Sequence, residues 1–414
     1  MRIATCTPVN FAADSQFFGR DSGLLCRGFQ SAGHDAFVVM PGFIRPDDEP
    51  GVTRCTAVEL KSSAWWKSQQ LDLVVLYAWG DPRYREVAEA IREACIFLVQ
   101  SLDTAGLNTP YGNTREWWQC LVGMLDGPQN PIKKIRLLAK ACRDLLPHIF
   151  EHKRLAMIDC SNAVALVSEP AAQSVSAYAC ALGYPQIAGK LMVVPHPVSP
   201  LMVPGTEPKL KKVLVVGRWL EEDRHQKDSE LTMAVLGEFL ESCPEWSAEV
   251  VGRGSTALQT ITTDWYKNTR ERLILTEAIP RTELVARYQQ SRILLCCSRH
   301  ESFHISSAEA LCCGCSIVVA DHPLLASTCW FTSRNSGTLA VSRTQANLRS
   351  ALLSEARKWE ERARDPDIIA NSWMPVLHAD LVTANLIQKS NSIVDTHYNH
   401  QRRCLPSPDF TEPR

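Results

Sequence analysis

The chain has 414 residues, of which 45% are hydrophobic and 21% charged, and its formal net charge is −1. These values exclude extended disorder and a bulk nucleic-acid-binding protein, and the length suggests two domains rather than one core. Sixteen cysteines are scattered, often within apolar runs. This usage indicates small buried hydrophobic residues in a reduced, cytoplasmic protein, rather than disulfides or a zinc site.

The first residues run directly into a strand-like segment, which predicts that no signal peptide is present. No window reaches the roughly 18–20 uninterrupted apolar residues of a membrane-spanning helix. We therefore expect a protein that is not integral to a membrane.

The first part of the chain alternates strand-like and helix-like segments, with a helix beginning near Ser22. Alternating units of this kind predict a parallel sheet with helices on both faces, here a Rossmann-like domain over residues 1–198. The predicted strands cover 3–6, 36–40, 73–77, 96–101, 163–167 and 191–194.

Residues 132–154 are predicted to form a distinct, insertion-like helix. Apolar residues line one face and basic residues another, and the span holds seven basic residues against two acidic ones. Two interpretations stay open: a solvated face that caps the first domain, or an interfacial helix that meets anionic lipid headgroups at the inner face of the membrane. The apolar set is Ile135, Leu138, Ala139, Cys142, Leu145 and Ile149.

A segment rich in proline, residues 199–212, is the predicted linker to a second domain. Residues 213–370 repeat the alternating pattern and predict a second doubly wound sheet, so that a ligand site is expected in the cleft between the domains. A C-terminal helix over 371–388 is expected to pack back toward the first domain, and 389–414 is expected to be a disordered tail.

The segment 298–320 carries the strongest functional signal. An apolar strand leads into a polar turn, the turn leads into a helix, and Gly314 ends that helix. Unpaired N–H groups at a helix N-terminus suit a diphosphate, and the carboxylates of Glu301 and Glu309 suit paired sugar hydroxyls. Each residue alone has an ordinary explanation, because Glu309 also completes a capping box with Ser306, and Glu301 fits an exposed loop carboxylate.

The combination resembles the donor-site signature of the retaining glycosyltransferases of family 4, the "group 1" glycosyl transferases. The shared pattern runs from Glu301 to Glu309, with Phe303 two residues after the first glutamate and Ala-Leu-x-x-Gly after the second. The resemblance covers roughly residues 1–345 and implies a GT-B fold, in which two Rossmann-like domains face a central cleft. Weaker matches occur in the same order at 33–35, 156–169, 193–198, 215–227, 250–254 and 280–288.

The resemblance also implies which residues bind a nucleotide-diphosphate sugar. Arg218 and Lys227 would neutralise the charge that grows on the leaving diphosphate. Glu301 would hold the hydroxyls of the donor sugar, and Glu309 those of the ribose. Further donor-binding candidates are Phe303, His304, Ile305, Ser306, Gly252 and Gly254. Candidates on the acceptor side are Gly19, Arg20 and Asp103.

Three positions depart from the family pattern. Many members carry a His-Asp pair at the end of a first-domain strand, whereas residues 99–104 here contain Asp103 and no histidine. The glycine that usually follows the donor-motif phenylalanine is His304, which either contacts the donor or fills space. The Gly-Gly of the first loop is replaced by Gly19-Arg20, where Arg20 is a candidate for an additional phosphate contact.

We therefore expect a hexosyl- or related glycosyltransferase that retains the anomeric configuration. No cofactor and no metal are expected, because cationic side chains and helix N–H groups would take the diphosphate charge and no Asp-x-Asp motif stands near a predicted strand end. The acceptor is left open among saccharide, lipid-linked and small-molecule hydroxyls, and nucleic acid is not expected as a partner.

Two alternatives remain. The first is a catalytically degenerate relative that keeps the fold as a binding or scaffold module. The second is a Rossmann-type oxidoreductase, which requires a Gly-x-Gly-x-x-Gly spacing that neither 216–219 nor 251–255 provides.

Overall fold

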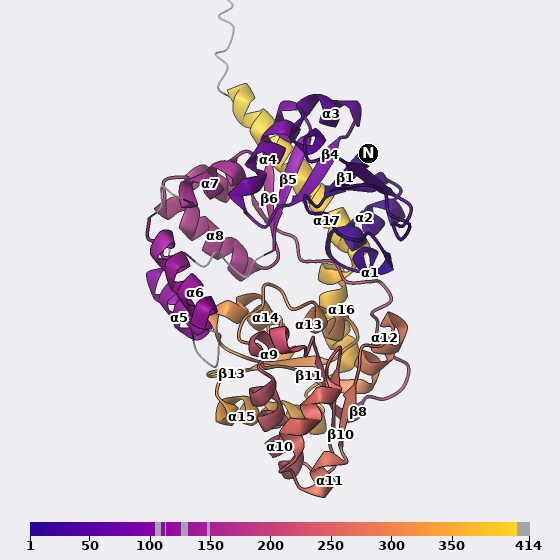
Figure 1. Ribbon diagram of the computed structural model, residues 1–414. Helices are drawn as coiled ribbons and strands as arrows, with labels where there is room; N and C mark the ends of the chain where they lie inside the picture. The colour runs from indigo at the N-terminus through magenta and orange to yellow at the C-terminus, as the bar shows by residue number, and fades with distance from the viewer. Residues whose placement is uncertain (104–108, 112, 126–130, 147–149, 404–414) are drawn as a thin grey trace, which may run out of the picture.

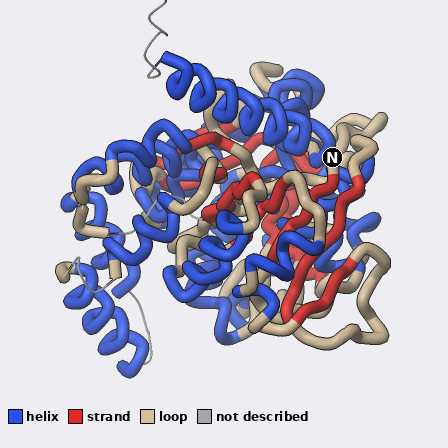
Figure 2. Tube along the Cα trace, turned by 90° about the horizontal axis from the view of Figure 1, so that it is seen from above, coloured by secondary structure: helices blue, strands red, loops and turns tan. Residues whose placement is uncertain are grey.

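The computed structural model describes residues 1–103, 109–111, 113–125, 131–146 and 150–403 (Figure 1). Two parallel sheets lie in two Rossmann-like domains, so the predicted fold class is confirmed. Helices surround the strands, as the view from above shows (Figure 2). None of the helices in these ranges is both long and apolar enough to cross a membrane.

The first sheet has the strand order β3-β2-β1-β4-β5-β6-β7, and its recorded pairings are all parallel. The central strand β4 is buried along its whole length, because its sequence Leu-Val-Val-Leu-Tyr is apolar on both faces. The strands are β1 (Arg2–Cys6), β2 (Asp35–Pro41), β3 (Val52–Cys55), β4 (Leu73–Tyr77), β5 (Phe97–Leu102), β6 (Ala163–Leu166) and β7 (Leu191–Val193).

The helices of the first half of the chain include a pair, α5 and α6, that lies at the edge of the molecule in Figure 1. The α-helices are α1 (Ser15–Phe18), α2 (Asp21–Ser31), α3 (Ser63–Ser68), α4 (Arg85–Glu93), α5 (Thr114–Leu125), α6 (Pro131–Asp144), α7 (Glu151–Asp159) and α8 (Glu169–Ala181). The 3-10 helices are η1 (Glu59–Lys61), η2 (Pro82–Tyr84) and η3 (Pro185–Lys190).

The single helix predicted over 132–154 is wrong in its extent. Helix α6 ends at Asp144 and α7 begins at Glu151. Pro147 lies between them in the sequence, and a proline disfavours an unbroken helix because it lacks the N–H donor. The predicted apolar face is not buried, since Ile135 is 65% and Leu138 48% exposed. Ile149 lies outside the described residues.

The second sheet has the strand order β10-β9-β8-β11-β12-β13. Lys209, in the predicted linker, is buried. Its Nζ donates to the carbonyl oxygens of Tyr288 and Gln289, just before β11, and of Ser291, where β11 begins. The linker therefore already packs on the second domain. The strands are β8 (Leu210–Val216), β9 (Ser247–Val251), β10 (Leu273–Thr276), β11 (Ser291–Cys296), β12 (Ser316–Ala320) and β13 (Gly337–Ala340).

The remaining helices belong to the second half of the chain. The α-helices are α9 (Glu221–Lys227), α10 (Ser229–Ser242), α11 (Lys267–Arg270), α12 (Arg281–Gln290), α13 (Ile305–Cys312), α14 (Ala326–Trp330), α15 (Gln345–Glu360), α16 (Pro366–Leu377) and α17 (Ala379–Arg403). The 3-10 helices are η4 (Thr256–Thr262) and η5 (Pro323–Leu325).

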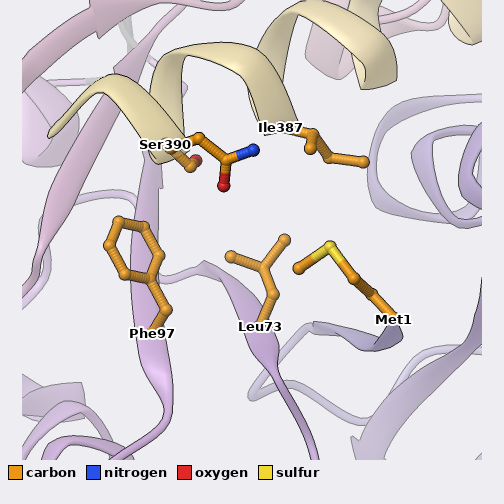
Figure 3. Close-up of a pocket in the computed structure, with 6 residues that line it drawn as sticks. Met1, Leu73, Phe97, Ile387 and Ser390 are labelled. Atoms are coloured by element: carbon orange, nitrogen blue, oxygen red, sulfur yellow. The ribbon is translucent and has the colours of Figure 1, made fainter. Parts of the chain in front are cut away.

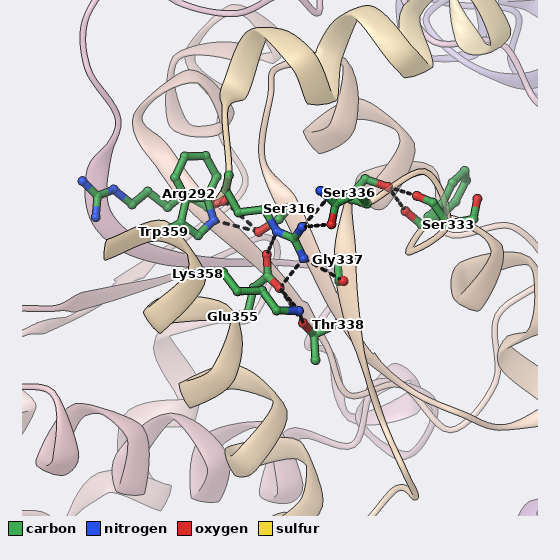
Figure 4. A network of polar contacts seen from close by, with 12 residues as sticks. Arg292, Ser316, Ser333, Ser336, Gly337, Thr338, Glu355, Lys358 and Trp359 are labelled. Carbon is green, nitrogen blue, oxygen red and sulfur yellow. Dashed lines mark hydrogen bonds and ion pairs between the residues drawn. The ribbon is translucent and has the colours of Figure 1, made fainter. Parts of the chain in front are cut away.

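A buried ion-pair network joins α15 to the edge of the second sheet (Figure 4). Glu355 is fully buried, and both of its carboxylate oxygens accept hydrogen bonds from Arg364, at 2.6 and 2.9 Å. Arg364 also donates to the carbonyl oxygen of Gly337 in β13. Trp359 donates to Ser316 at the start of β12. The network fixes the starts of β12 and β13 against α15.

The last helix, α17, returns to the first domain and packs against α2. Val382 and Leu386 lie in the same buried cluster as residues of β1, β2 and β4. A small apolar cavity of about 190 Å³ remains between the helix and the sheet, lined by Met1, Leu73, Phe97 and Ile387 among others (Figure 3). The helix continues to Arg403, whereas a disordered tail was predicted from residue 389. The prediction is therefore wrong for residues 389–403, and residues 404–414 lie outside the described part of the chain.

Candidate functional site

A cavity of about 420 Å³ lies between the two domains. It is where the loops that follow β5, β8 and β11 meet, which are the carboxyl ends of parallel strands and the usual ligand site of such sheets. Its lining residues are Arg20, Asp21, Asp103, His196, Val216, Gly217, Arg218, Gln226, Lys227, Glu301, Ser302, Phe303, His304, Ile305 and Ser306.

The cavity brings together most of the residues that the sequence singled out, from both domains. The predicted residues that line it are Arg20, Asp103, Arg218, Lys227, Glu301, Phe303, His304, Ile305 and Ser306. Four predicted residues are not part of its wall: Gly19, Gly252, Gly254 and Glu309.

Lys227 and Glu301 form an ion pair in the cavity wall. Lys227 ends α9, and its Nζ lies 2.6 Å from Oε1 of Glu301, with side-chain exposures of 14% and 9%. Burial opposes ionisation of Glu301, but His304 and Lys227 beside it hold its pKa below the usual value. Arg218 is at the rim, 71% exposed and 3.2 Å from Asp223. The wall thus presents cations that a diphosphate can reach.

His304 stands immediately before helix α13 in a left-handed backbone conformation, with φ of 63°. Glycine adopts this conformation at the lowest cost, which explains why the family pattern has glycine here. The imidazole is buried, and its Nδ1 lies 2.6 Å from the hydroxyl of Ser307. Burial lowers the pKa of His304 to about 4, so the ring is neutral at pH 7.

Glu309 does not complete a capping box, because α13 begins at Ile305 and its N-cap is His304. Its carboxylate instead pairs with Arg281 and accepts a hydrogen bond of 2.9 Å from the hydroxyl of Tyr288. Burial raises the pKa of Glu309 against the opposing effect of Arg281. The predicted ribose-binding carboxylate is therefore engaged by protein groups in this conformation.

Arg281 also connects the two domains. Its second terminal nitrogen donates to the carbonyl oxygen of Gly19 at 2.6 Å. A β-carbon on Gly19 would lie 3.1 Å from that nitrogen, which leaves little space for a side chain. Gly19 thus holds the first loop close to α12, whereas its neighbour Arg20 reaches the cavity.

Gly252 and Gly254 lie in the loop after β9, outside the cavity lining. Gly252 has φ of 132°, and a β-carbon there would lie 1.8 Å from the carbonyl oxygen of Gly217. Gly254 has φ of 83° and donates its N–H to Glu277 at 2.8 Å. Both glycines allow the loops after β8 and β9 to lie together, and Gly217 is the one that reaches the cavity.

The sequence did not identify His196 as a site residue, although it stands out between two prolines at the domain junction. Its Nε2 lies 2.9 Å from Oδ1 of Asp103, and its Nδ1 lies 3.9 Å from Oδ1 of Asp21. The His-Asp pair that residues 99–104 lack is thus present in space, with the histidine supplied from the junction between domains.

No group of three or more metal-ligating side chains occurs among the residues placed by the structure. An Asp-x-Asp sequence does occur at Asp365–Asp367, far from the cavity lining. Asp365 caps helix α16 by accepting from the N–H groups of Asp367 and Ile368. Its role is that of a helix cap.

One family model matches part of the chain. Residues 203–364 match the family model "Glycosyl transferases group 1", which corresponds to the second domain. No curated protein sequence matches this chain.

Solved structures share the fold over almost the whole chain. Sucrose-phosphate synthase from Thermosynechococcus elongatus is 12% identical with a TM-score of 0.58, and covers 96% of this chain and 100% of its own. Anabaena HepE in complex with UDP is 14% identical with a TM-score of 0.60, at 95% and 100% coverage. Trehalose 6-phosphate synthase from Burkholderia multivorans is 10% identical with a TM-score of 0.62, at 96% and 99%. At these identities the comparison shows the GT-B fold.

Proposed function

We propose that this chain is a glycosyltransferase that moves a sugar from a nucleotide-diphosphate sugar to an acceptor hydroxyl, with retention of configuration. The observation that carries the proposal is the cavity at the domain junction, in which Lys227, Arg218 and the N-terminus of α13 converge. The match of 203–364 to the group 1 family and the GT-B fold agree with it. HepE binds UDP in its solved complex, and we extend that ligand class to this cavity.

The chemistry needs charge stabilisation rather than a protein nucleophile. The bond from the anomeric carbon to the diphosphate oxygen breaks, a bond to the acceptor oxygen forms, and the acceptor proton passes to the diphosphate. Negative charge grows on the leaving group, and we assign its stabilisation to Lys227, Arg218 and the N–H groups of Ile305 and Ser306, residues that line the cavity. These donors make a metal unnecessary in the proposed reaction.

Glu301 and Glu309 are the proposed sugar and ribose contacts. Glu301 lines the cavity and is already fixed by Lys227. Glu309 lies behind the wall, where Arg281 and Tyr288 hold it. Donor binding at Glu309 therefore requires that the link from Arg281 rearrange, and such closure motions are common in enzymes of two domains.

A thermal-shift screen with UDP-glucose, GDP-mannose and ADP-glucose tests the proposal, because a ligand that binds only the folded state raises the melting temperature. We expect one of them to stabilise the wild type, and Lys227→Ala to remove that response. Stabilisation by NAD but by none of the three sugars would favour the oxidoreductase. Sugar binding without turnover would favour a scaffold that has kept the fold.

The surface of α6 leads us to propose an anionic membrane as a further partner. Ile132, Ile135 and Leu138 are 58%, 65% and 48% exposed, at helical spacing. Five basic residues lie on the same helix, and the one acidic residue, Asp144, is buried beside Arg143. Exposed apolar side chains flanked by basic ones match the interface of anionic lipids.

Vesicle co-sedimentation tests this partner. With phosphatidylcholine vesicles containing about 30% phosphatidylglycerol, we expect Arg136→Glu/Lys140→Glu to lower partitioning at least tenfold, since each basic residue near such a surface contributes ~1 kcal/mol. The control, Lys67→Glu/Lys267→Glu, reverses two exposed charges elsewhere and should bind like the wild type. Equal partitioning of all three proteins would contradict the membrane contact.

A further inference from the structure

The first-domain side of the cavity holds a buried charge pair that the donor chemistry above does not use. The His196 side chain is 4% exposed, and its Nε2 lies 2.9 Å from Oδ1 of Asp103. Among the described residues neither atom has a hydrogen-bond partner other than this contact, so each of the two groups depends on the other for charge compensation. A buried polar pair in this state requires a functional explanation.

Aromatic rings from both domains hold the imidazole in place. Tyr77, at the end of β4, stacks on it with ring centres 6.4 Å apart and planes 19° apart. Phe303, from the turn before α13, meets it edge-on at 5.3 Å. His196 therefore has a fixed orientation only when the two domains are together.

The charges around the ring favour an imidazolium beside a carboxylate. Burial lowers the pKa of His196, but Asp103 and Asp21 outweigh it and the resulting pKa is raised, with Arg20 the opposing cation. Burial raises the pKa of Asp103, but His196, Ser302 and Arg20 outweigh it and the resulting pKa is lowered. The carboxylate of Asp103 is thus ionised at neutral pH.

The exposed part of Asp103 points to the kind of ligand. Asp103 lines the cavity and its side chain is 29% exposed, whereas Oδ1 is closed off from solvent against His196, which leaves Oδ2 as the oxygen available to a ligand. A carboxylate oxygen only accepts hydrogen bonds. Its ligand must be a donor, and Asp21 disfavours a phosphate there while Arg20 disfavours an ammonium group. A neutral hydroxyl is a hydrogen-bond donor and carries neither the negative charge that Asp21 disfavours nor the positive charge that Arg20 disfavours.

We propose that Asp103 binds the attacking hydroxyl of the acceptor and that His196 is its positioning residue, so that the acceptor is an uncharged alcohol at its reacting position. This inference rests on the proposed glycosyl transfer and identifies the acceptor half of the same site. The hydroxyl keeps its proton until the carbon–oxygen bond forms, and the proton then passes to the leaving diphosphate. The pair ends each turnover in its starting protonation state.

Kinetics test the two roles separately, with water as the acceptor and with whichever of the three nucleotide sugars stabilises the protein most. We expect Asp103→Asn to lower kcat by about tenfold or more while affinity for the nucleoside diphosphate changes less than about twofold. In the wild type kcat should fall as pH rises through the raised pKa of His196. This decrease should be absent from the pH profile of kcat for His196→Gln. A kcat within about twofold of wild type for both variants would overturn the proposal, as would an equal loss of nucleotide affinity.

A second measurement needs no nucleotide and no turnover. D-glucose supplies hydroxyls, so its addition should shift the ring proton resonances of His196 in the wild type and leave them unchanged in Asp103→Asn. No response of the wild type to glucose would refute the hydroxyl subsite. If the wild type bound no nucleotide but kept the glucose response, the proposed sugar transfer would fail while the subsite stood.

Discussion

Replacing Lys227 with methionine should destabilise the protein as well as disable it, and the two effects can be separated. Lys227 Nζ lies 2.6 Å from Glu301 Oε1, and the side chains are 14% and 9% exposed. Removing one partner of a buried ion pair costs about 3–5 kcal/mol, because the other charge is left without compensation. His304, which also lowers the pKa of Glu301, compensates only in part, because burial lowers its own pKa to about 4.

The destabilisation caused by Lys227→Met should depend on pH, and the pKa of Glu301 determines the direction of that dependence. In the wild type the pKa of Glu301 is lowered, so its contribution to stability is present above the unfolded-state pKa and is lost as pH falls. Without Lys227 burial dominates and the pKa of Glu301 rises. The variant should then lose stability relative to wild type as pH rises from the lowered pKa of Glu301 in the wild type to its higher pKa in the variant, because the unfolded-state carboxyl is the same in both proteins.

Urea denaturation at pH 7.5 and at pH 5 measures the difference, and the double variant Lys227→Met/Glu301→Gln is the matched control. Removing both charges should recover most of the loss, while activity stays absent in both variants. A single variant within about 1 kcal/mol of wild type at pH 7.5 would refute the reasoning, because a buried unpaired charge costs more than that. So would a double variant no more stable than the single one.

Three further outcomes follow from the structure. Gly252→Ala should yield little folded protein, because its β-carbon would lie 1.8 Å from the Gly217 carbonyl oxygen at φ of 132°; soluble yield and melting temperature report this. Hydrogen bonds from Arg54 and from backbone N–H groups lower the pKa of Asp48 to about 2. Ionised Asp48 should therefore stabilise the fold above about pH 3.9, and this contribution should be lost as pH falls toward 2. The melting temperatures of wild type and Asp48→Asn, measured against pH, should converge there. Turnover in EDTA should equal turnover in added magnesium, and a metal requirement would contradict the proposed charge stabilisation.

The buried parts of the fold were accessible from the sequence because they are uninterrupted apolar runs. The predicted strand at 73–77 coincides with β4. The edge strands β3 and β13 were not predicted, because their sequences, Val-Thr-Arg-Cys and Gly-Thr-Leu-Ala, contain no continuous apolar run. An edge strand is partly solvated and needs no continuous apolar stretch.

The donor side of the site could be predicted because its residues lie within one strand–turn–helix unit. The contacts of Glu309 with Arg281 and of Asp103 with His196 join residues far apart in the chain. Sequence spacing carries no information on such contacts. Only the arrangement of two sheets around a junction shows that a histidine between two prolines faces an aspartate after β5.

Helix α17 has a consequence for how the protein is made. Val382 and Leu386 complete the core of the first domain, and a β-carbon at Gly28 would lie 2.7 Å from the backbone oxygen of Ala379. During translation these residues emerge after the whole second domain, so until then the first domain lacks the apolar side chains that complete its core. A premature stop codon before Ala379 should therefore damage the domain made first, and residues 1–198 expressed alone lack part of their own core.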